Sequence, residues 1–157
     1  MAVLIRWEPR YCGPVPGWVG IAVSVAVVLV ASAIGAAWRA RSGRFRAPVG
    51  PKTEPALAAL GVAPGGVTLL QFSTTFCAPC RSTRAFCAEI ARTVPGVRHV
   101  EIDAESHLAE VRALDVWRTP TVLVIDHNGV VRSRAAGPTN RAQLLAAVAE
   151  VMELVAA

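Results

Sequence analysis

Hydrophobic and polar positions divide this chain of 157 residues into two unlike parts. From Trp18 to Trp38 there is not one Asp, Glu, Lys or Arg. After residue 53, short apolar runs alternate with amphipathic stretches at helical spacing. A long uninterrupted apolar run is typical of a transmembrane helix, whereas the alternation of short runs and amphipathic stretches is typical of a globular α/β domain.

The second part predicts a mixed β-sheet with helices on both faces. A helix is expected to begin at Thr53, whose side chain can cap it, and to end at Gly61. Asn128-Gly129 is the pair that a tight hairpin favours, so the two strands beside it should be antiparallel. In chain order we expect a helix at 53–61, a strand at 67–73, a helix at 77–93, a strand at 97–103, a helix at 105–114, strands at 121–125 and 130–136, and a helix at 140–155.

The apolar run is long enough to cross a bilayer. At about 1.5 Å per residue, a helix places Trp18 and Trp38 roughly 30 Å apart, and tryptophan is common at both membrane interfaces. A buried helix of a soluble protein and a cleaved signal peptide are the alternatives, although the apolar part of a signal peptide is normally about 7–15 residues. We therefore expect a tail at 1–17, a transmembrane helix at 18–38 that binds the lipid bilayer, a basic juxtamembrane linker at 39–52 and a globular domain at 53–157.

The positive charge of the chain belongs to its N-terminal third. Residues 1–52 hold seven basic residues and one acid, whereas residues 53–157 hold nine arginines and ten acids. The domain therefore lacks the basic surface of a nucleic-acid-binding protein, and we expect no nucleic acid as a partner. The flank after the apolar run is richer in basic residues than the flank before it. This bias predicts a single-pass protein of the cell membrane with its domain in the cytoplasm, the alternative being an extracytoplasmic domain.

Two cysteines three positions apart follow the first predicted strand of the domain, in Cys77-Ala78-Pro79-Cys80. The order strand, loop, cysteine pair, helix places Cys77 at a helix N-terminus, where unpaired N–H groups and the helix dipole favour the thiolate. The thiolate is the form that attacks disulfides. A metal site of Cys77, Cys80, Cys87 and a histidine is an alternative, but structural zinc normally uses two such pairs, so we expect no metal.

The other two cysteines carry weaker signals. Cys87 lies two helical turns after Cys80 and so on the same face of the predicted helix. Two interpretations of Cys87 stay open, a small buried apolar residue and a third redox thiol. Cys12 lies before the apolar run, without a readable context.

With these motifs the domain resembles thioredoxin, and the whole chain resembles membrane-anchored thioredoxin-family proteins of bacteria. The resemblance rests on the cysteine motif after a strand, Thr119-Pro120-Thr121 before a strand, the Asn128-Gly129 hairpin and Gly137 before the last helix. It implies a thioredoxin fold over residues 53–157. It also implies that Pro120 follows a cis peptide bond and lies against the cysteines.

The resemblance further implies the roles of the site residues. Cys77 would be the nucleophile that forms a mixed disulfide with the substrate, and Cys80 would resolve it. Phe76 and the Thr119-Pro120 backbone would form the substrate groove, and Ala78 and Pro79 would form the loop between the cysteines. The dithiol/disulfide pair is then the redox group, and no cofactor is expected.

The function implied is a thiol-disulfide oxidoreductase that reduces protein disulfides. Its partners would be proteins with disulfides and an unidentified electron donor. Two alternatives remain: an extracytoplasmic anchored thiol reductase of the cytochrome c maturation type, which usually carries insertions in the fold, and a redox-silent thioredoxin-fold binding module.

The sequence departs from the family pattern around the cysteines. Phe76 and Ala78 stand where Trp and Gly are usual, and His99 stands where a Lys is often found. Gln71 replaces a buried Asp that commonly serves as proton acceptor for the second cysteine, and we expect Gln71 to lie beneath the site. Arg81 and Arg84, near the helix start, either support the thiolate or are simply solvated.

Overall fold

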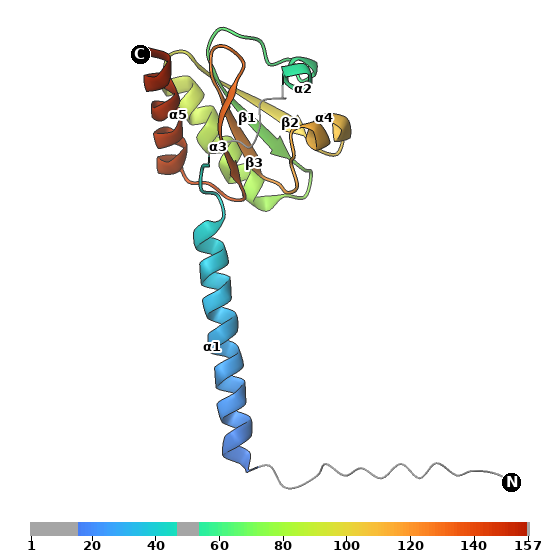
Figure 1. Ribbon diagram of the computed structural model, residues 1–157, viewed down its shortest axis with the longest axis vertical. Helices are drawn as coiled ribbons and strands as arrows, with labels where there is room; N and C mark the ends of the chain where they lie inside the picture. Colours follow the sequence, from blue (N-terminus) through green and yellow to red (C-terminus); the bar gives the residue numbers. More distant parts are fainter. Residues whose placement is uncertain (1–15, 47–53, 157) are drawn as a thin grey trace, which may run out of the picture. The chain divides into compact units, whose positions relative to one another are not determined.

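The computed structural model describes residues 16–46 and 54–156. These residues form two compact units that meet in sequence at residues 40 and 41, and each is considered by itself. Figure 1 shows the helices and strands and labels most of them. Cys12, Lys52, the predicted Thr53 cap and most of the predicted tail lie outside the described residues.

The described residues of the first unit form one long helix, α1, which runs from Gly17 to Arg41 and so ends one residue beyond the boundary between the units. It contains the whole predicted span 18–38 and adds one residue before it and three after it. None of its residues is buried, and its apolar side chains point outward all round. Within the described residues it is the one helix long and apolar enough to cross a membrane, a test that a signal sequence also passes.

The second unit is built on a four-stranded mixed sheet. Its strands are β1 (Val67–Ser73), β2 (Val97–Asp103), β3 (Thr121–Ile125) and β4 (Val131–Ala136). They lie in the order β2-β1-β3-β4, with β1 parallel to β2 and antiparallel to β3, and with β3 antiparallel to β4. All residues of β1 are buried, as expected for a central strand that is covered on both faces. The predicted mixed sheet is confirmed.

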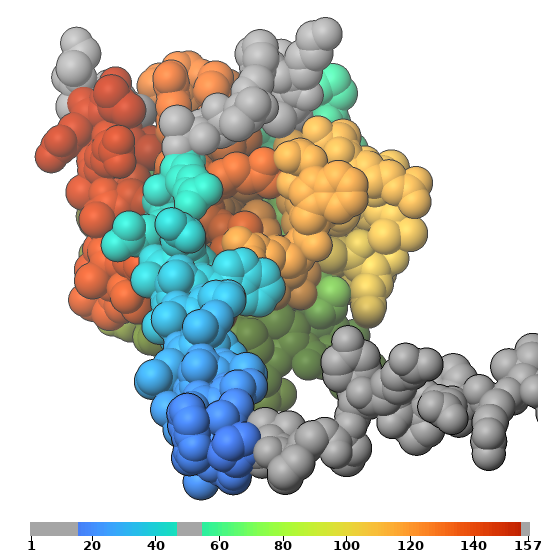
Figure 2. Space-filling model, turned by 60° about the horizontal axis from the view of Figure 1, so that its bottom comes forward, coloured from blue at the N-terminus to red at the C-terminus, as the bar shows by residue number. Residues whose placement is uncertain are grey.

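Helices cover both faces of the sheet. These are α2 (Glu54–Ala59), α3 (Ala78–Thr93), α4 (Leu108–Ala113) and α5 (Arg141–Ala156). Successive side chains of β1 point to opposite faces of the sheet. Leu69 packs in a cluster with residues of α3 and α5, whereas Leu70 packs in a cluster with residues of α2 and the loop after α4. In Figures 1 and 2, α5 and α4 accordingly lie on opposite sides of the domain.

Carboxylates build the turns that set two element boundaries. Asp103 accepts hydrogen bonds from the Glu105 N–H and the Ser106 hydroxyl, so the chain turns there and α4 begins later than the predicted residue 105. Asp126 is buried and accepts the N–H groups of Asn128 and Val130. It thereby closes the predicted hairpin between β3 and β4.

Part of the segment predicted as a linker pairs with the sheet. The Gly43 N–H donates to the Ala136 carbonyl, and Arg46 exchanges two backbone hydrogen bonds with Arg134 of β4. Phe45 packs against the cluster between the sheet and helices α3 and α5. Residues 43–46 therefore run along the β4 edge of the sheet, which would otherwise be unpaired there.

Candidate active site

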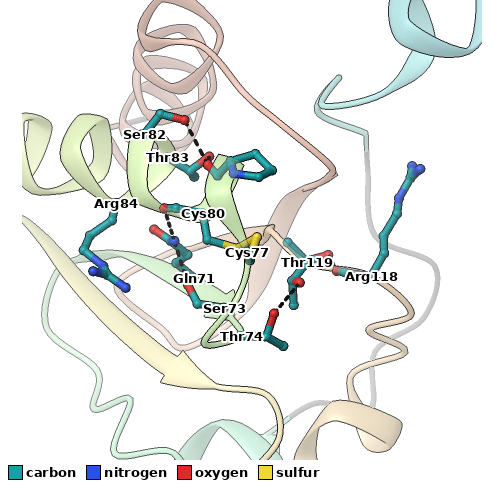
Figure 3. Close-up of a disulfide and its surroundings, with 12 residues drawn as sticks. Gln71, Ser73, Thr74, Cys77, Cys80, Ser82, Thr83, Arg84, Arg118 and Thr119 are labelled. Carbon is teal, nitrogen blue, oxygen red and sulfur yellow. Dashed lines mark hydrogen bonds between the residues drawn. A yellow bond between two sulfur atoms is a disulfide. The ribbon is translucent and has the colours of Figure 1, made fainter.

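The cysteine pair lies at the start of α3. Cys77 is the N-cap of this helix, with extended backbone angles, and Pro79 lies in the first turn. This order follows from the sequence, because proline is well tolerated where helix N–H groups have no partner in any case. Cys77 and Cys80 form a disulfide, with an S–S distance of 2.01 Å (Figure 3). The predicted placement of Cys77 at a helix N-terminus is confirmed.

The two sulfurs differ in their access to solvent. Cys77 is partly exposed and borders a pocket, whereas Cys80 is only 1% exposed. Ala78 and Pro79, in the loop between them, are exposed. A partner in disulfide exchange can therefore reach Cys77 but not Cys80. The roles expected from the resemblance, Cys77 as nucleophile and Cys80 as resolving cysteine, require this asymmetry.

The Thr119–Pro120 segment lies on one side of the disulfide. The peptide bond between the two residues is cis, as the resemblance implies. Figure 3 shows Thr119 beside the disulfide, and its hydroxyl lies 3.2 Å from that of Thr74. Pro120 is buried, and its carbonyl accepts the Gly137 N–H at 2.7 Å, which ties this segment to the end of β4.

Large apolar side chains are exposed next to both parts of the site in the sequence, one beside Cys77 and one close to Thr119. Phe76, predicted to contact substrate, is 96% exposed, and Trp117 is 87% exposed. The Trp117 indole N–H donates to the Asp115 carboxylate, which fixes the direction of the ring. Trp117 was not predicted as a site residue, although a tryptophan two positions before Thr119-Pro120 is a signal that could have been used. Exposed aromatic side chains are typical of protein-binding surfaces.

A mainly apolar groove runs beside Thr119. Its volume is about 320 Å³, and it lies between the end of β1, helix α4 and the loop after α4. Its lining consists of Thr74, Ala104, Glu105, Leu108, Val111, Val116, Trp117, Arg118 and Thr119. The groove thus joins the predicted substrate residue Thr119 to the exposed Trp117.

Gln71 lies beneath the cysteines, fully buried on β1. Its amide nitrogen donates to the Ser73 hydroxyl at 2.9 Å and to the Cys80 carbonyl at 3.0 Å (Figure 3). The Ser73 hydroxyl in turn donates to the Glu101 carboxylate at 2.6 Å. Both groups that face the amide nitrogen are therefore acceptors, and the amide oxygen of Gln71 is left buried without a partner.

The carboxylate in this network belongs to Glu101 of β2, which lies opposite Gln71 of β1 in the register of the two strands. Arg84 of α3 binds it through two contacts of 2.5 and 2.6 Å. Burial acts to raise the pKa of Glu101, but the hydrogen bonds from Arg84 and Ser73 outweigh it, so the pKa lies below its usual value. Arg84 is thus paired with the carboxylate of Glu101. The sequence had suggested instead that Arg84 either supports the Cys77 thiolate or is simply solvated.

His99 and Cys87 lie on the same side of the sheet, toward α3. Burial lowers the pKa of His99, and its Nε2 atom is buried without a hydrogen-bond partner. Cys87 is fully buried, and burial, together with the charge of Glu101, raises the pKa of its thiol to about 12. Cys87 is therefore a neutral residue of the core at physiological pH. This agrees with its interpretation as a small buried apolar residue rather than a third redox thiol. Among the described residues, no three His, Cys, Asp or Glu side chains gather as a metal-ligand set.

A comparison with protein families matches residues 62–150 to the thioredoxin family. This match covers more than half of the chain and includes both cysteines, the cis proline and the hairpin. The chain belongs to the thioredoxin family. A thioredoxin-family domain with a Cys-x-x-Cys pair in disulfide contact indicates a thiol-disulfide oxidoreductase.

Individual relatives agree with this assignment. Thioredoxin H5 of Oryza sativa subsp. japonica is 29% identical over 73 residues, which are 46% of this chain and 54% of that protein. The chain therefore spans about half the length of this curated relative. Thioredoxin of Fasciola hepatica (TM-score 0.51, 20% identity) and oxidised mitochondrial thioredoxin 3 of Saccharomyces cerevisiae (TM-score 0.52, 18% identity) share the fold. Each of these alignments covers 62% of this chain, and 89% and 88% of the two structures respectively.

Proposed function

We propose that this thioredoxin-family domain reduces disulfides of protein substrates. The observation that carries the proposal is the asymmetry of the cysteine pair: Cys77 caps a helix and is accessible, while Cys80 is buried one turn later. In the reduced protein, the helix N-terminus stabilises the Cys77 thiolate. The dithiol is regenerated by an electron donor after each turnover.

The exchange proceeds in two balanced steps. The Cys77 thiolate attacks one sulfur of the substrate disulfide, an S–S bond forms between Cys77 and that sulfur, and the other substrate sulfur leaves as a thiolate. Cys80 then loses its proton and attacks Cys77, which releases the second substrate sulfur. Two electrons have passed to the substrate, and the Cys77–Cys80 disulfide of the structure has formed.

The surface beside the disulfide fits an extended protein segment. The groove between Thr119 and Trp117 offers apolar side chains close to the accessible sulfur. The side chains of Phe76 and Trp117 are almost fully exposed to solvent. Burial of such aromatic surface favours protein partners over small polar ones. A redox-silent binding role would leave the accessible disulfide without a use.

Mixed-disulfide trapping tests this proposal. Cys80→Ser should accumulate substrates bound through Cys77, because attack survives and resolution does not, whereas Cys77→Ser should abolish disulfide reduction. The measurement is non-reducing electrophoresis of the purified variants with insulin, followed by mapping of the linked cysteine. Trapping through Cys80 in the Cys77→Ser variant would reverse the assigned roles.

We further propose that α1 anchors the domain in the cell membrane, with the domain in the cytoplasm. The support is a helix that is apolar on every side, followed by more basic residues than precede it. Cys77 provides the readout of orientation. The cells are first treated with dithiothreitol, which is then removed, because a maleimide reacts with the thiol of Cys77 and not with its disulfide. In a Cys12→Ser background, a membrane-impermeant maleimide should then label Cys77 in permeabilised cells but not in intact ones, and labelling in intact cells would place the domain outside.

A further inference from the structure

A second pocket borders the disulfide, and its character differs from that of the Thr119 groove. Its volume is about 480 Å³, within the range of roughly 300–1,000 Å³ that is typical of small-molecule sites. It lies where the ends of β1 and β2 meet the start of α3, and it is lined by Ser73, Thr74, Thr75, Cys77, Arg81, Arg84, Glu101 and Asp103. No large apolar side chain lines it, so it suits a small polar molecule rather than an apolar peptide segment.

The charges in this pocket are unequally available. Arg84 and Glu101 neutralise each other through their two short contacts. Arg81 is exposed and has no hydrogen bond or ion pair within the described part of the chain. Its guanidinium can therefore bind a carboxylate without giving up an existing partner, and such forked contacts are a usual mode of carboxylate recognition.

Asp103 offers a complementary group. Each of its carboxylate oxygens accepts one hydrogen bond, from the Glu105 N–H or the Ser106 hydroxyl, and a carboxylate has acceptor sites beyond these two. An ammonium group can therefore bind beside Asp103 while a carboxylate binds Arg81. The pocket thus combines a free cation, an accessible anion and the exposed sulfur of Cys77.

We propose that this pocket binds a low-molecular-weight thiol of the amino-acid or short-peptide type, and that this thiol is an electron donor to the Cys77–Cys80 disulfide. The proposal rests on the proposed function, because it names the class of reductant that the same disulfide uses. The pocket is present in the disulfide form, which is the form that a reductant meets. Protein substrates meet the dithiol, and they use the apolar groove at Thr119.

The electron transfer balances with two equivalents of the small thiol. The thiolate of the first attacks Cys77, forms an S–S bond with it and displaces Cys80 as a thiolate, which takes up a proton. The thiolate of the second attacks the sulfur of the bound ligand and releases Cys77 as a thiolate. The products are the dithiol form of the protein and the disulfide of the small thiol.

Reduction of the oxidised full-length chain in detergent micelles tests the pocket. The probes are cysteine and cysteine methyl ester, which differ in the free carboxylate, with 2-mercaptoethanol as an uncharged reference. Loss of the disulfide is followed by acid quenching and alkylation with a mass tag. The rate constant of each thiol is divided by its rate constant with 2-hydroxyethyl disulfide at the same pH, so that differences in thiol pKa and in thiolate nucleophilicity cancel. We expect cysteine to react about three- to tenfold faster than its ester, as a partly solvated ionic contact allows.

Substitutions then decide whether Arg81 is the cause. Arg81→Ala should bring the cysteine-to-ester ratio close to one, and Arg81→Lys should keep part of the preference. Arg92→Ala is the matched control, because Arg92 is also an exposed arginine of α3 but lies at its other end, and it should keep the wild-type ratio. The ratio is the readout because a change in the reactivity of Cys77 itself affects both probes alike.

A ratio near one in the wild type, or a preference that Arg81→Ala leaves intact, would overturn the proposal. The proposed function is tested separately, with the chain reduced by dithiothreitol and then mixed with insulin. Reduction of insulin without any preference for cysteine would reject the pocket and keep the oxidoreductase. Failure to reduce insulin would reject the oxidoreductase itself.

Discussion

Gln71 occupies the position beneath Cys80 where the family commonly carries a buried aspartate. The structure places its side chain in a fully buried site and gives its amide nitrogen two acceptors, Ser73 and the Cys80 carbonyl. A carboxylate in this position could not donate a hydrogen bond to the Cys80 carbonyl when ionised. Glutamine thus satisfies the Cys80 carbonyl without placing a charge in a dry environment, but it cannot take a proton from the Cys80 thiol.

Gln71→Asp should therefore lower the free energy of unfolding and raise the rate of turnover. Burial should raise the pKa of the new carboxyl above the roughly 3.9 of free aspartate, so the folded state favours its protonated form. The resulting loss of unfolding free energy should be small at pH 4 and should grow as the pH rises toward the folded pKa. It should reach about 1.4 kcal/mol for each pH unit that separates the folded pKa from the unfolded one. Urea unfolding of both proteins in detergent at pH 4 and pH 8 measures it.

The same variant should release the mixed disulfide faster near neutral pH, because a carboxylate there can accept the Cys80 proton. Turnover of a model disulfide at pH 7 is the measurement. Equal loss of stability at pH 4 and pH 8 would show that position 71 is solvated, which is incompatible with the buried site described above.

Glu101 should contribute stability with the opposite pH dependence. Its pKa is lowered in the folded protein, so its contribution is present above the unfolded pKa and is lost as the pH falls through the folded pKa. Glu101→Gln should cost at most about 1 kcal/mol at pH 7, because 26% of the Glu101 side chain and half of Arg84 are exposed. The cost should shrink as the pH falls below the usual pKa of glutamate, because both forms of the protein then carry a neutral group at position 101. The exposed Glu150→Gln serves as control, and a cost for Glu101→Gln that is independent of pH would contradict the ion pair.

At the level of elements, the short segment 43–46 along β4 depends on one glycine. Gly43 has φ +73°, and a Cβ on it would lie 1.8 Å from the Pro138 carbonyl oxygen. Gly61 has nearly the same φ, +72°, but a Cβ there would meet nothing within 4 Å. An alanine at Gly61 would therefore introduce only the strain of a left-handed backbone. An alanine at Gly43 would add a clash with the backbone of Pro138 to the same strain.

Gly61→Ala should cost about 1 kcal/mol of unfolding free energy, the usual penalty for a left-handed alanine. Gly43→Ala should cost roughly 2–4 kcal/mol, because the backbone must also move away from Pro138. Urea unfolding of the two variants in detergent provides the comparison. Equal costs would mean that the segment 43–46 is not held against β4 in solution.

The elements themselves were largely predictable. Strands 67–73, 97–103 and 121–125 are predicted with the bounds that the structure has, because each is a run of apolar or alternating residues between turn-forming ones. The start of α4 was predicted three residues too early, because the Asp103 side chain builds a turn there, and periodicity does not detect such a turn. The segment 43–46 contains arginines and a glycine, so nothing in its sequence indicates that it pairs with an edge strand.

The candidate site was predictable only in part. The cysteine pair is a motif that is local in sequence, whereas the cis peptide bond before Pro120 was expected only from the resemblance to the thioredoxin family. The network of Gln71, Ser73 and Glu101 depends on the register between β1 and β2, which places Glu101 beside Gln71 although the two residues are far apart in the sequence. No pattern along one strand contains that information.

For the molecule as a whole, α1 should hold the chain in the membrane. The full chain should stay with the membrane fraction through high-salt and carbonate washes, because a helix that is apolar on all sides is not held by charge alone. Immunoblotting of the fractions and N-terminal sequencing of the retained protein are the measurements. Release of the intact chain by carbonate would contradict a spanning helix, and a new N-terminus near residue 37 would support a signal peptide.

The burial of Cys87 has a consequence for the covalent states that the folded domain can reach. Three cysteines allow three different disulfides, and Cys87 lies only two helical turns from Cys80. Burial raises the pKa of the Cys87 thiol to about 12, however, so this thiol stays protonated and unreactive at pH 7. Burial of Cys87 in the core therefore disfavours a disulfide that involves it. Under the proposed function, the domain would then have one oxidised form, with the Cys77–Cys80 disulfide, and one reduced form.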